Sequence, residues 1–377
     1  MKRTETFIFA GGGTGGHLYP AVALAEKIKS AKPGCHIHFV GTARGIESRV
    51  VPELGYPLHR IVVRGFARQL TLKNLLAPFA LVWSVLQCIL LFVKIRPTAV
   101  IGTGGYVSGP VLFVAGLLRT PSVIQEQNSY PGVTTRMLAK VVDRVHLSFE
   151  ESKQFFKCSQ KLVVTGNPVR EFDLAKDKKK IRNNLNLDTD APTLLITGGS
   201  QGAHAINVVV MECLHQLLEE TPLQVIWSTG RADLQTVQNK AAPFQDRVKV
   251  FEFITNMEDV MIAADLILAR AGALTLAEIT LCGLPAILVP YPFAAANHQE
   301  RNARALQQVG AAVVLLQHEL TNDVLLNTLK DLLRHPAKMT QMSRAAKQAA
   351  FPNAAADIVQ SIFELIESRQ AGVRHES

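Results

Sequence analysis

Residues 6–28 read TFIFAGGGTGGHLYPAVALAEKI, and this stretch determines which class of fold the chain can adopt. An apolar run leads into a glycine-rich loop, and an apolar helical stretch follows the loop. A strand, a glycine loop and a helix in this order open a Rossmann-like domain. The same order recurs at residues 193–214, TLLITGGSQGAHAINVVVMECL, so the sequence predicts two Rossmann-like domains in tandem.

Short apolar, β-branched runs alternate with helical stretches along the rest of the chain, a pattern typical of α/β proteins with parallel sheets. The first half has such runs near TFIFA, HIHFV, RIVV, TAVIG, PSVIQE, RVHLS and KLVVTG. The second half has them near TLLITG, QVIWSTG, RVKVFEF, DLILARAG, PAILVPY and AAVVLL. A charged stretch without a strand signal, residues 171–192, separates the two series. We therefore expect domains at 1–166 and 167–340, followed by a C-terminal helix and frayed tail at 341–377.

The charge of the chain is divided unevenly between its halves. The whole chain has 40 Lys and Arg against 31 Asp and Glu, a net charge of +9. Residues 1–170 contain 21 basic and 8 acidic residues, whereas residues 171–377 contain 19 basic and 23 acidic ones. The excess positive charge of the first half indicates an anionic partner there: a nucleic acid, a membrane surface or a phosphorylated substrate. A solvated basic face without a partner is the alternative.

Residues 75–93, LLAPFALVWSVLQCILLFV, contain no charged side chain. The stretch approaches the ~20 apolar residues that a membrane-spanning helix needs. However, Pro78 shortens the continuous apolar helix, and a span would separate the strands before it from those after it. We therefore expect a helix partly buried against the sheet, with an ordinary packing helix as the alternative. The side chains available to enter a membrane surface are Leu75, Leu76, Phe79 and Trp83.

The first glycine loop, residues 11–16, satisfies the G-x-G-x-x-G pattern. A dinucleotide site also needs an acidic residue at the end of the second strand, but there the next acid is Glu47, beyond Gly41 and Thr42. NAD and FAD are therefore disfavoured, and we expect no cofactor. His17 follows the loop at the start of a helix, whose positive end favours a neutral imidazole. A neutral histidine can accept a proton, so His17 is the candidate general base, with a loop-bracing histidine as the alternative.

Three further glycine-rich loops follow predicted strands. Residues 102–109, GTGGYVSG, complete a platform for a pyrophosphate together with the first loop. Residues 198–203, GGSQGA, place Ser200 and backbone N–H groups at a helix start, which suits a diphosphate leaving group. Residues 269–278, ARAGALTLAE, open another helix, where Glu278 can accept both ribose hydroxyls of a nucleotide. The candidate contacts of the acceptor pyrophosphate are Gly13, Gly104, Gly105 and Tyr106.

The cysteines and acidic pairs do not indicate a metal site. The five cysteines are scattered and lack a C-x-x-C motif, a pattern typical of a reducing compartment. Cys35, His36 and His38 could suggest a metal site, but the two histidines fall in the alternating run HIHFV, which favours a strand. The one D-x-D motif, residues 188–190, precedes the strand TLLITG and so lies at the end of the sheet away from the glycine loops. We expect a solvated turn there and no bound metal.

These motifs together resemble those of the MurG family of peptidoglycan N-acetylglucosaminyltransferases. The matching strings are GGGTGGHLYPAVALA, IGTGGYVSGP, IQEQNSYPGVTTRMLA, VTGNPVR, GGSQGAHAIN, RAGALTLAEI and GLPAILVPYPFAAANHQERNA. They extend from residue 11 to 303, and their combination and order are far more specific than any single glycine motif. The apolar stretch 75–93 is more continuous than expected for the family.

The resemblance implies a GT-B fold, in which two Rossmann-like domains with parallel sheets face each other across a cleft. It also implies inverting transfer of GlcNAc from UDP-GlcNAc to the MurNAc C4 hydroxyl of undecaprenyl-pyrophosphoryl-MurNAc-pentapeptide, which converts lipid I to lipid II. The catalytic candidates are then His17 as the base and Glu126 near the acceptor. The implied donor contacts are Thr14, Gly15, Gly16, Asn128, Arg170, Ser200, Ile254, Ala273, Leu274, Thr275, Leu276, Ala277, Glu278 and Gln299.

The expected partners are UDP-GlcNAc, lipid I and an anionic membrane surface, which implies a peripheral protein on the cytoplasmic face of the bacterial inner membrane. A UDP-GlcNAc 2-epimerase or a glycolipid galactosyltransferase shares the same two-domain fold and remains an alternative. A membrane-surface sensor that binds nucleotide sugars without catalysis is a third. Nucleic-acid binding is disfavoured, because aromatic residues make up only 6% of the chain and no recognition motif is present.

Overall fold

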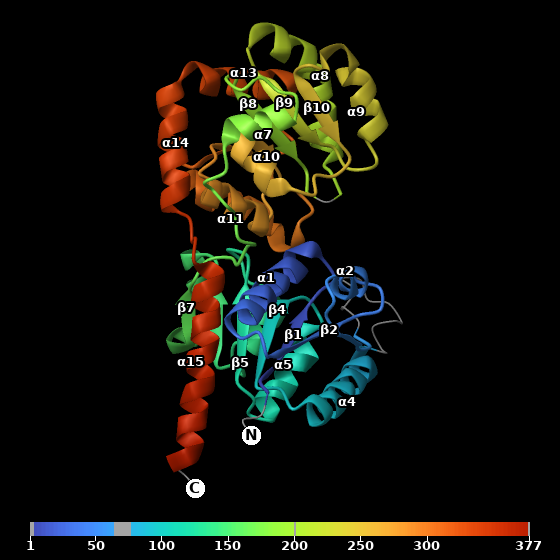
Figure 1. The fold of residues 1–377 in the computed structure, drawn as a ribbon, viewed down its shortest axis with the longest axis vertical. Coiled ribbons are helices and arrows are strands. Elements are labelled where there is room, and N and C mark those ends of the chain that lie inside the picture. The colour runs from blue at the N-terminus through green and yellow to red at the C-terminus, as the bar shows by residue number, and fades with distance from the viewer. Residues whose placement is uncertain (1–3, 64–76, 200, 376–377) are drawn as a thin grey trace. The chain divides into compact units, whose positions relative to one another are not determined.

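The computed structural model describes residues 4–63, 77–199 and 201–375. The chain divides into two units, of which unit 1 comprises Met1–Arg170 with Asn353–Ser377 and unit 2 comprises Glu171–Pro352. Each unit is a parallel β-sheet covered by helices (Figure 1). The predicted α/β class with two Rossmann-like domains is confirmed.

The sheet of unit 1 has the strand order β3-β2-β1-β4-β5-β6-β7 in the part of the chain that the structure describes. Every predicted strand of the first half forms, although the third, expected at RIVV, begins two residues earlier. The strands are β1 (Thr6–Gly11), β2 (His36–Gly41), β3 (Leu58–Arg60), β4 (Ala99–Gly104), β5 (Ser122–Glu126), β6 (Arg144–Leu147) and β7 (Leu162–Val164).

The strand order reverses at β1, which pairs with β2 on one side and with β4 on the other. Ligands of such sheets bind outside the carboxyl ends of the strands at this switch point. The register of β1 and β4 shifts at their carboxyl ends, where Gly11 lies opposite Gly104. The first two glycine loops therefore start side by side.

Helices cover both faces of this sheet because the side chains of β1 alternate. Phe7 and Phe9 are fully buried on one face, against α1 (Gly15–Ala31) and α15 (Ala354–His375). Ile8 and Ala10 are buried on the other, against α4 (Ala77–Ile95), α5 (Ser108–Leu117) and α6 (Val133–Leu138). Each fully buried phenylalanine contributes about 1.5–3 kcal/mol of hydrophobic stabilisation. The smaller elements of unit 1 are α2 (Glu47–Glu53), η1 (Glu150–Phe155) and η2 (Ser159–Lys161).

The C-terminal helix α15 belongs to unit 1, although the sequence analysis set residues 341–377 apart. Ile358 and Ile362 of α15 are fully buried in the same cluster as Phe7. Arg144 of β6 donates to the carbonyl (2.9 Å) and hydroxyl (2.7 Å) oxygens of Ser361. The expected helical stretch is therefore two helices: α14 (Pro336–Gln348) in unit 2 and α15 in unit 1, and Pro352 lies between them.

Unit 2 has the strand order β10-β9-β8-β11-β12-β13 among its described residues, and the order reverses at β8. All six predicted strands of the second half are present: β8 (Thr193–Thr197), β9 (Gln224–Ser228), β10 (Val248–Phe251), β11 (Leu266–Ala269), β12 (Ala286–Leu288) and β13 (Ala312–Val314). Its remaining elements are α7 (Lys178–Asn184), α8 (His204–Glu220), α9 (Leu234–Ala241), η3 (Ala242–Phe244), α10 (Met257–Ala263), α11 (Ala273–Cys282), η4 (Ala295–Asn297), α12 (His298–Gln308) and α13 (Asn322–Arg334).

The core of unit 2 contains one buried aromatic side chain with a polar group, Trp227 of β9. Its indole N–H donates to Oδ1 of Asn207 at 3.0 Å, so the polar atom of the ring is satisfied. Asn207 in turn donates to the carbonyl oxygen of Thr229 (2.8 Å) and to Asp233 (2.7 Å). This network fixes the start of α8 against the end of β9.

Residues 77–93 of the apolar stretch lie in α4. The other two residues of the stretch, Leu75 and Leu76, lie outside the described residues. Cys88 and Phe92 are buried against the sheet, whereas Phe79 and Trp83 are 74% and 55% exposed. In the described part of the chain, no helix combines the length and the apolar character that crossing a membrane requires. The predicted helix partly buried against the sheet is present.

Candidate functional site

The first glycine loop closes over the carboxylate of Glu47, which is fully buried at the start of α2. This carboxylate accepts hydrogen bonds from the N–H of Gly13 (2.8 Å), the N–H of Thr42 (2.9 Å) and the Thr42 hydroxyl (2.8 Å). Burial alone would raise the pKa of Glu47, but these hydrogen bonds hold it below its ordinary value. Glu47 is therefore an anion that ties the loop to the end of β2.

His17 lies in the first turn of α1 with one ring nitrogen engaged and the other open. Its Nδ1 is 3.1 Å from the carbonyl oxygen of Thr103 and 3.0 Å from Oε1 of Gln127. Both partners are acceptors, so Nδ1 carries the proton and Nε2 keeps its lone pair. Within the described ranges, no group hydrogen-bonds to Nε2. The geometry gives His17 a fixed tautomer with a free basic nitrogen.

Gln127 is held in the orientation that this tautomer needs. Its Nε2 donates to the carbonyl oxygens of Thr103 (2.6 Å) and Gln125 (3.1 Å) and to the side-chain oxygen of Gln125. Because all three partners are acceptors, the amide nitrogen must face them and the amide oxygen must face His17. Gln127 is only 3% exposed, so water does not compete for these bonds.

Gly104 and Gly105 bring the second loop against the first. Their φ angles of 106° and 76° lie in the left-handed region that favours glycine. A Cβ atom on Gly104 would lie 2.6 Å from Nδ1 of His17, and one on Gly105 would lie 2.6 Å from the carbonyl oxygen of Gly12. Glycine at both positions allows the imidazole to lie between the two loops.

The backbone N–H groups of the two loops differ in whether they are available to a ligand. The N–H of Gly13 is used by Glu47, and that of Gly104 donates to Oγ of Ser108 at 3.1 Å. Gly13 and Gly104 were both expected at the acceptor pyrophosphate, but their N–H groups donate hydrogen bonds that stabilise the loops. Several other N–H groups at this edge meet no acceptor among the described residues, and those of Gly15, Gly16, Gly105 and Tyr106 are among them. Such groups at helix starts and loop ends suit an anion.

Glu126 ends β5 and is 3% exposed. Its Oε1 accepts from the backbone (3.1 Å) and side-chain (3.3 Å) nitrogens of Asn128, and its Oε2 accepts from the N–H of Gly132 at 3.2 Å. Both carboxylate oxygens therefore support the loop of residues 126–132. Across the described residues, no hydrogen bond joins Glu126 to His17, although the chain neighbour of Glu126, Gln127, accepts one from His17.

The remaining donor-contact candidates of unit 1 are exposed at its surface. Thr14 precedes α1 with an extended backbone, and its side chain makes no capping hydrogen bond. Arg170 is exposed and is the last residue of unit 1 before the chain enters unit 2. Tyr106, from the acceptor set, is 55% exposed.

In unit 2 the predicted phosphate loop, residues 198–203, lies at the carboxyl end of β8, and Ser200 falls outside the described residues. Gly202 has a φ of 75° and packs directly on the backbone of Thr229. The N–H groups of Ala203 and His204, at the start of α8, find no acceptor in the described part of the chain. This is the predicted arrangement of backbone donors at a helix start.

The predicted nucleotide contacts 273–278 form the first turns of α11, directly after β11. Leu276 is buried, and the other five are partly exposed. Ile254 is 6% exposed and follows β10. Gln299, in the first turn of α12, accepts a hydrogen bond from the N–H of Tyr291 at 2.9 Å. The ring of the neighbouring His298 lies against the carbonyl oxygen of Ala295, with Nδ1 at 2.7 Å.

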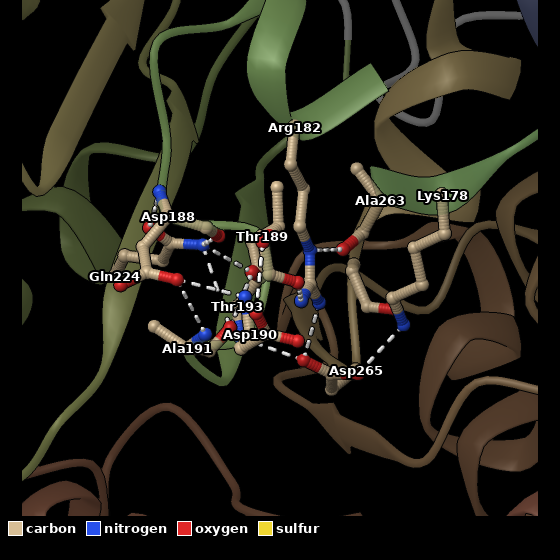
Figure 2. Close-up of polar contacts among 11 residues, drawn as sticks. Lys178, Arg182, Asp188, Thr189, Asp190, Ala191, Thr193, Gln224, Ala263 and Asp265 are labelled. Atoms are coloured by element: carbon tan, nitrogen blue, oxygen red, sulfur yellow. Dashed lines mark hydrogen bonds and ion pairs between the residues drawn. The ribbon is translucent and has the colours of Figure 1, made fainter. Parts of the chain in front are cut away.

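The D-x-D motif precedes β8 and so lies at the other end of this sheet, and Figure 2 shows the polar contacts around it. Asp188 accepts from the N–H groups of Asp190 (2.8 Å) and Ala191 (3.3 Å), which closes a turn. The carboxylate of Asp190 is 2.7 Å from the ammonium of Lys179. The predicted turn is therefore present. Among the described residues, no three His, Cys, Asp or Glu side chains gather so that they could hold a metal ion.

Three residues that shape these sites were not predicted from the sequence. Gln127 belongs to the string IQEQN and follows Gln125 by two residues, so the period of β5 places both side chains on the same face of the sheet. This spacing is the sequence pattern that could have identified Gln127. Glu47 was noted only as an acid too far along the chain to bind a ribose. Arg270, after β11, donates to the carbonyl oxygens of Val289 and Pro290, both at 3.1 Å, and burial lowers its pKa.

Comparison with known proteins identifies the same two-unit arrangement. Residues 7–147 match the glycosyltransferase family 28 N-terminal domain, and residues 193–358 match the glycosyltransferase family 28 C-terminal domain. A MurG crystal structure from Acinetobacter baumannii has a TM-score of 0.77 at 32% identity, over 96% of this chain and 99% of that chain. A structure titled as a UDP-N-acetylglucosamine 2-epimerase from Listeria monocytogenes has a TM-score of 0.69 at 13% identity, which shows the fold alone.

Two relatives carry the name UDP-N-acetylglucosamine–N-acetylmuramyl-(pentapeptide) pyrophosphoryl-undecaprenol N-acetylglucosamine transferase. The protein from Chlorobaculum parvum is 44% identical over 96% of this chain and 99% of its own length. The protein from Acetivibrio thermocellus is 40% identical over 97% of this chain and 99% of its own length. With both domains matched and nearly the whole length aligned, the chain is a glycosyltransferase of family 28 and belongs to the MurG group of N-acetylglucosamine transferases.

Proposed function

We propose that this chain transfers N-acetylglucosamine from UDP-GlcNAc to undecaprenyl-pyrophosphoryl-MurNAc-pentapeptide, the step from lipid I to lipid II in peptidoglycan synthesis. The activity named for the relatives supports this proposal, because they align with the chain from end to end. The sites of both units lie at the carboxyl ends of parallel strands, where this fold binds its ligands.

The proposed chemistry is a single displacement with inversion. The C4 hydroxyl oxygen of MurNAc forms a bond to the anomeric carbon of GlcNAc. The bond from that carbon to UDP breaks, and its electron pair leaves on the diphosphate oxygen. The hydroxyl proton passes to Nε2 of His17, which acts as the general base.

The observation that carries this mechanism is the fixed tautomer of His17. Two acceptors, on Thr103 and Gln127, hold the proton on Nδ1, so the lone pair of Nε2 stays available for a hydroxyl. Glu126 is the weaker candidate, because both of its oxygens already accept hydrogen bonds from its own loop. We assign Glu126 the role of holding Asn128 in place beside the substrates.

Backbone donors and one arginine are proposed to bind the phosphate groups. The N–H groups of Gly105 and Tyr106 would bind the acceptor pyrophosphate at the edge of β4. The helix start at Ala203 and His204, with Ser200 and Arg170, would stabilise the charge that develops on the departing UDP. A planar guanidinium suits this role because it can donate two parallel hydrogen bonds to a phosphate. Thr14, Gly15 and Gly16 complete this set of donor contacts.

The nucleoside and sugar of the donor are assigned to the other loops of unit 2. Glu278 would accept hydrogen bonds from the ribose hydroxyls, and Gln299 would bind the GlcNAc hydroxyls. Ile254 and residues 273–277 line the path of the nucleotide. We propose that no metal ion or cofactor takes part, because helix starts and Arg170 supply the positive charge that a metal supplies in other transferases.

The proposed location is the cytoplasmic face of the bacterial inner membrane, with the enzyme bound peripherally to anionic lipid. The support is an apolar stripe along the exposed side of α4, which packs next to α5. Its members are Phe79, Val82, Trp83, Leu86, Leu90 and Val93. An exposed apolar surface on a basic domain suits insertion into an anionic leaflet better than it suits a nucleic acid. Leu75 and Leu76, outside the described residues, are assigned to the same contact.

The transfer of labelled GlcNAc from UDP-GlcNAc to a short-chain lipid I analogue tests the proposal, with UDP-GalNAc as the control donor. We expect transfer from UDP-GlcNAc only. His17→Ala should reduce turnover by about 10²–10⁴-fold while UDP binding stays intact. Unchanged turnover in His17→Ala would remove its role as the base, and binding of UDP-GlcNAc without transfer would refute the activity itself.

A further inference from the structure

A cavity of about 540 Å³ lies in unit 2 at the amino ends of β11 and β12. Its walls come from α10, the end of α11, α14 and the segment that leads into α7. The proposed donor site is at the opposite end of the same strands, beyond their carboxyl ends. The cavity therefore has no part in the function proposed above.

The α14 wall of the cavity is polar and positively charged. Thr340, Ser343, Arg344 and Lys347 all line the cavity and follow the i, i+3, i+4, i+7 spacing of one helix face. Met342, on another face of the helix, is buried in the core. Among the described residues, no carboxylate lies within 4 Å of the guanidinium of Arg344 or the ammonium of Lys347.

Lys347 extends along the end of α11. Gly283 terminates that helix with a φ of 66°, and a Cβ atom on Gly283 would collide with the aliphatic part of the Lys347 side chain. The missing side chain at Gly283 thus makes room for the lysine beside the cavity.

The one acidic side chain in the cavity wall, Asp265, is already saturated by partners, as Figure 2 shows. Its Oδ1 is 2.6 Å from Nζ of Lys178, and its Oδ2 is 2.7 Å from Nη2 of Arg182 and 2.8 Å from the N–H of Thr193. Arg182 is buried and spends its other nitrogens on the carbonyl oxygens of Ala263 (2.9 Å) and Thr189 (2.8 Å). Two cations face this single carboxylate, so Asp265 does not offset the charge of α14.

The opposite wall is apolar. Met261 of α10 and Leu281 and Leu284 at the end of α11 line it, and Met339 adds one apolar side chain from the α14 side. Burial, with a smaller effect from Glu278 and Glu258, raises the pKa of the Cys282 thiol to about 12, so this wall is uncharged at neutral pH. Glu258 itself is 2.8 Å from the ammonium of Lys176.

We propose that this cavity is a second ligand site, which binds a small phosphorylated molecule with an apolar body. The phosphate would meet Arg344, Lys347 and the Ser343 hydroxyl, because a guanidinium and an ammonium are the side chains that bind phosphate most strongly. The apolar body would lie on Met261 and Leu281. The volume is that of an ordinary small-molecule pocket. The positive charge is notable because residues 171–377 carry more acidic than basic side chains.

The cavity is lined by residues close to both ends of unit 2, where the chain enters the unit and where it leaves it. Leu174 and Lys178 follow the entry of the chain at Glu171, and α14 precedes its exit at Pro352. A ligand in the cavity would therefore lie between the segment that leads into the first helix of unit 2 and its last helix. Two sources supply such a ligand, a soluble phosphate ester and the head of a membrane phospholipid.

The test is a titration of the full chain followed by NMR of ¹³C-labelled methionine methyl groups, with UDP-GlcNAc added to occupy the donor site. Phenyl phosphate serves as the soluble probe, dihexanoyl phosphatidic acid as the lipid probe and phenol as the uncharged control. The signals of Met261 and Met339 should shift with either charged probe, while those of Met137 and Met211, which do not line the cavity, should not.

Arg344→Gln with Lys347→Gln should weaken binding by about tenfold for each removed cation. Lys240→Gln with Arg334→Gln removes two exposed charges of the same unit outside the cavity and should leave binding unchanged. Stronger binding of the lipid probe identifies a phospholipid as the source, and stronger binding of phenyl phosphate identifies a soluble ester. The proposal fails if neither probe moves Met261 and Met339, or if both double variants bind alike. Since no transfer activity is measured, failure here leaves the proposed function untouched.

Discussion

Replacement of Gln127 by methionine tests how His17 is prepared for catalysis. Methionine fills a similar volume but removes the acceptor 3.0 Å from Nδ1 of His17, and it leaves the carbonyl oxygen of Thr103, at 3.1 Å, as the remaining acceptor. A net neutral hydrogen bond is worth about 1 kcal/mol, and about 1.4 kcal/mol corresponds to a factor of ten. We therefore expect kcat to fall about fivefold, well short of the loss in His17→Ala, with the KM for UDP-GlcNAc unchanged.

A double-mutant cycle separates this positioning effect from general damage. The assay is transfer of GlcNAc to a soluble lipid I analogue by wild type, Gln127→Met, His17→Ala and the double variant. If Gln127 acts only through His17, its replacement has no further effect once the imidazole is gone. The reasoning would be refuted by an equal loss, about fivefold, in the His17→Ala background, because Gln127 would then act on the loops or the substrates directly.

Three further predictions concern stability and membrane binding. Glu47→Gln should lower the free energy of unfolding at pH 7 by about 1–3 kcal/mol, because a buried acceptor of three hydrogen bonds loses an oxygen. Since the folded pKa of Glu47 lies below 4.5, its contribution is present above that pH and is lost as the pH falls further, so urea titrations of wild type and variant should converge in acid. Asp265→Asn should cost about 2–4 kcal/mol by urea unfolding, because buried Arg182 loses its counter-charge; a cost under about 1 kcal/mol would contradict this. Phe79→Ser with Trp83→Ser should release the protein from phosphatidylglycerol vesicles at lower salt and leave transfer to a soluble acceptor unchanged; retention equal to wild type would argue against the membrane role of α4.

The strands were predictable because each buried parallel strand is a short apolar run, and β1 shows this directly with TFIFA. The position of His17 was predictable for a similar reason, since a glycine loop between a strand and a helix has a fixed place at the edge of a sheet. The partners of His17 were not, because Thr103 and Gln127 lie 86 and 110 residues away and meet it only once three loops converge.

The sequence also did not predict which sheet α15 packs against. Its apolar spacing predicts a helix with one buried face, but periodicity does not specify which sheet covers that face. The side-chain pairs that decide it, such as Arg144 with Ser361, are more than two hundred residues apart. The role of Glu47 was equally unpredictable. From the sequence, Glu47 lies too far along the chain to bind a ribose, and its burial under Gly13 becomes evident only once the chain turns after β2.

The return of the last helix to the first unit has a consequence for how the protein is made. A ribosome adds roughly 5–20 residues per second, so roughly 10–40 s separate the synthesis of Arg170 from that of the C-terminus. Throughout that interval the side of the first sheet that carries Phe7 and Phe9 lacks α15. The unit whose strands are made first therefore gains its last helix only after residues 171–352 have been made, and until then the face of Phe7 and Phe9 is covered without α15.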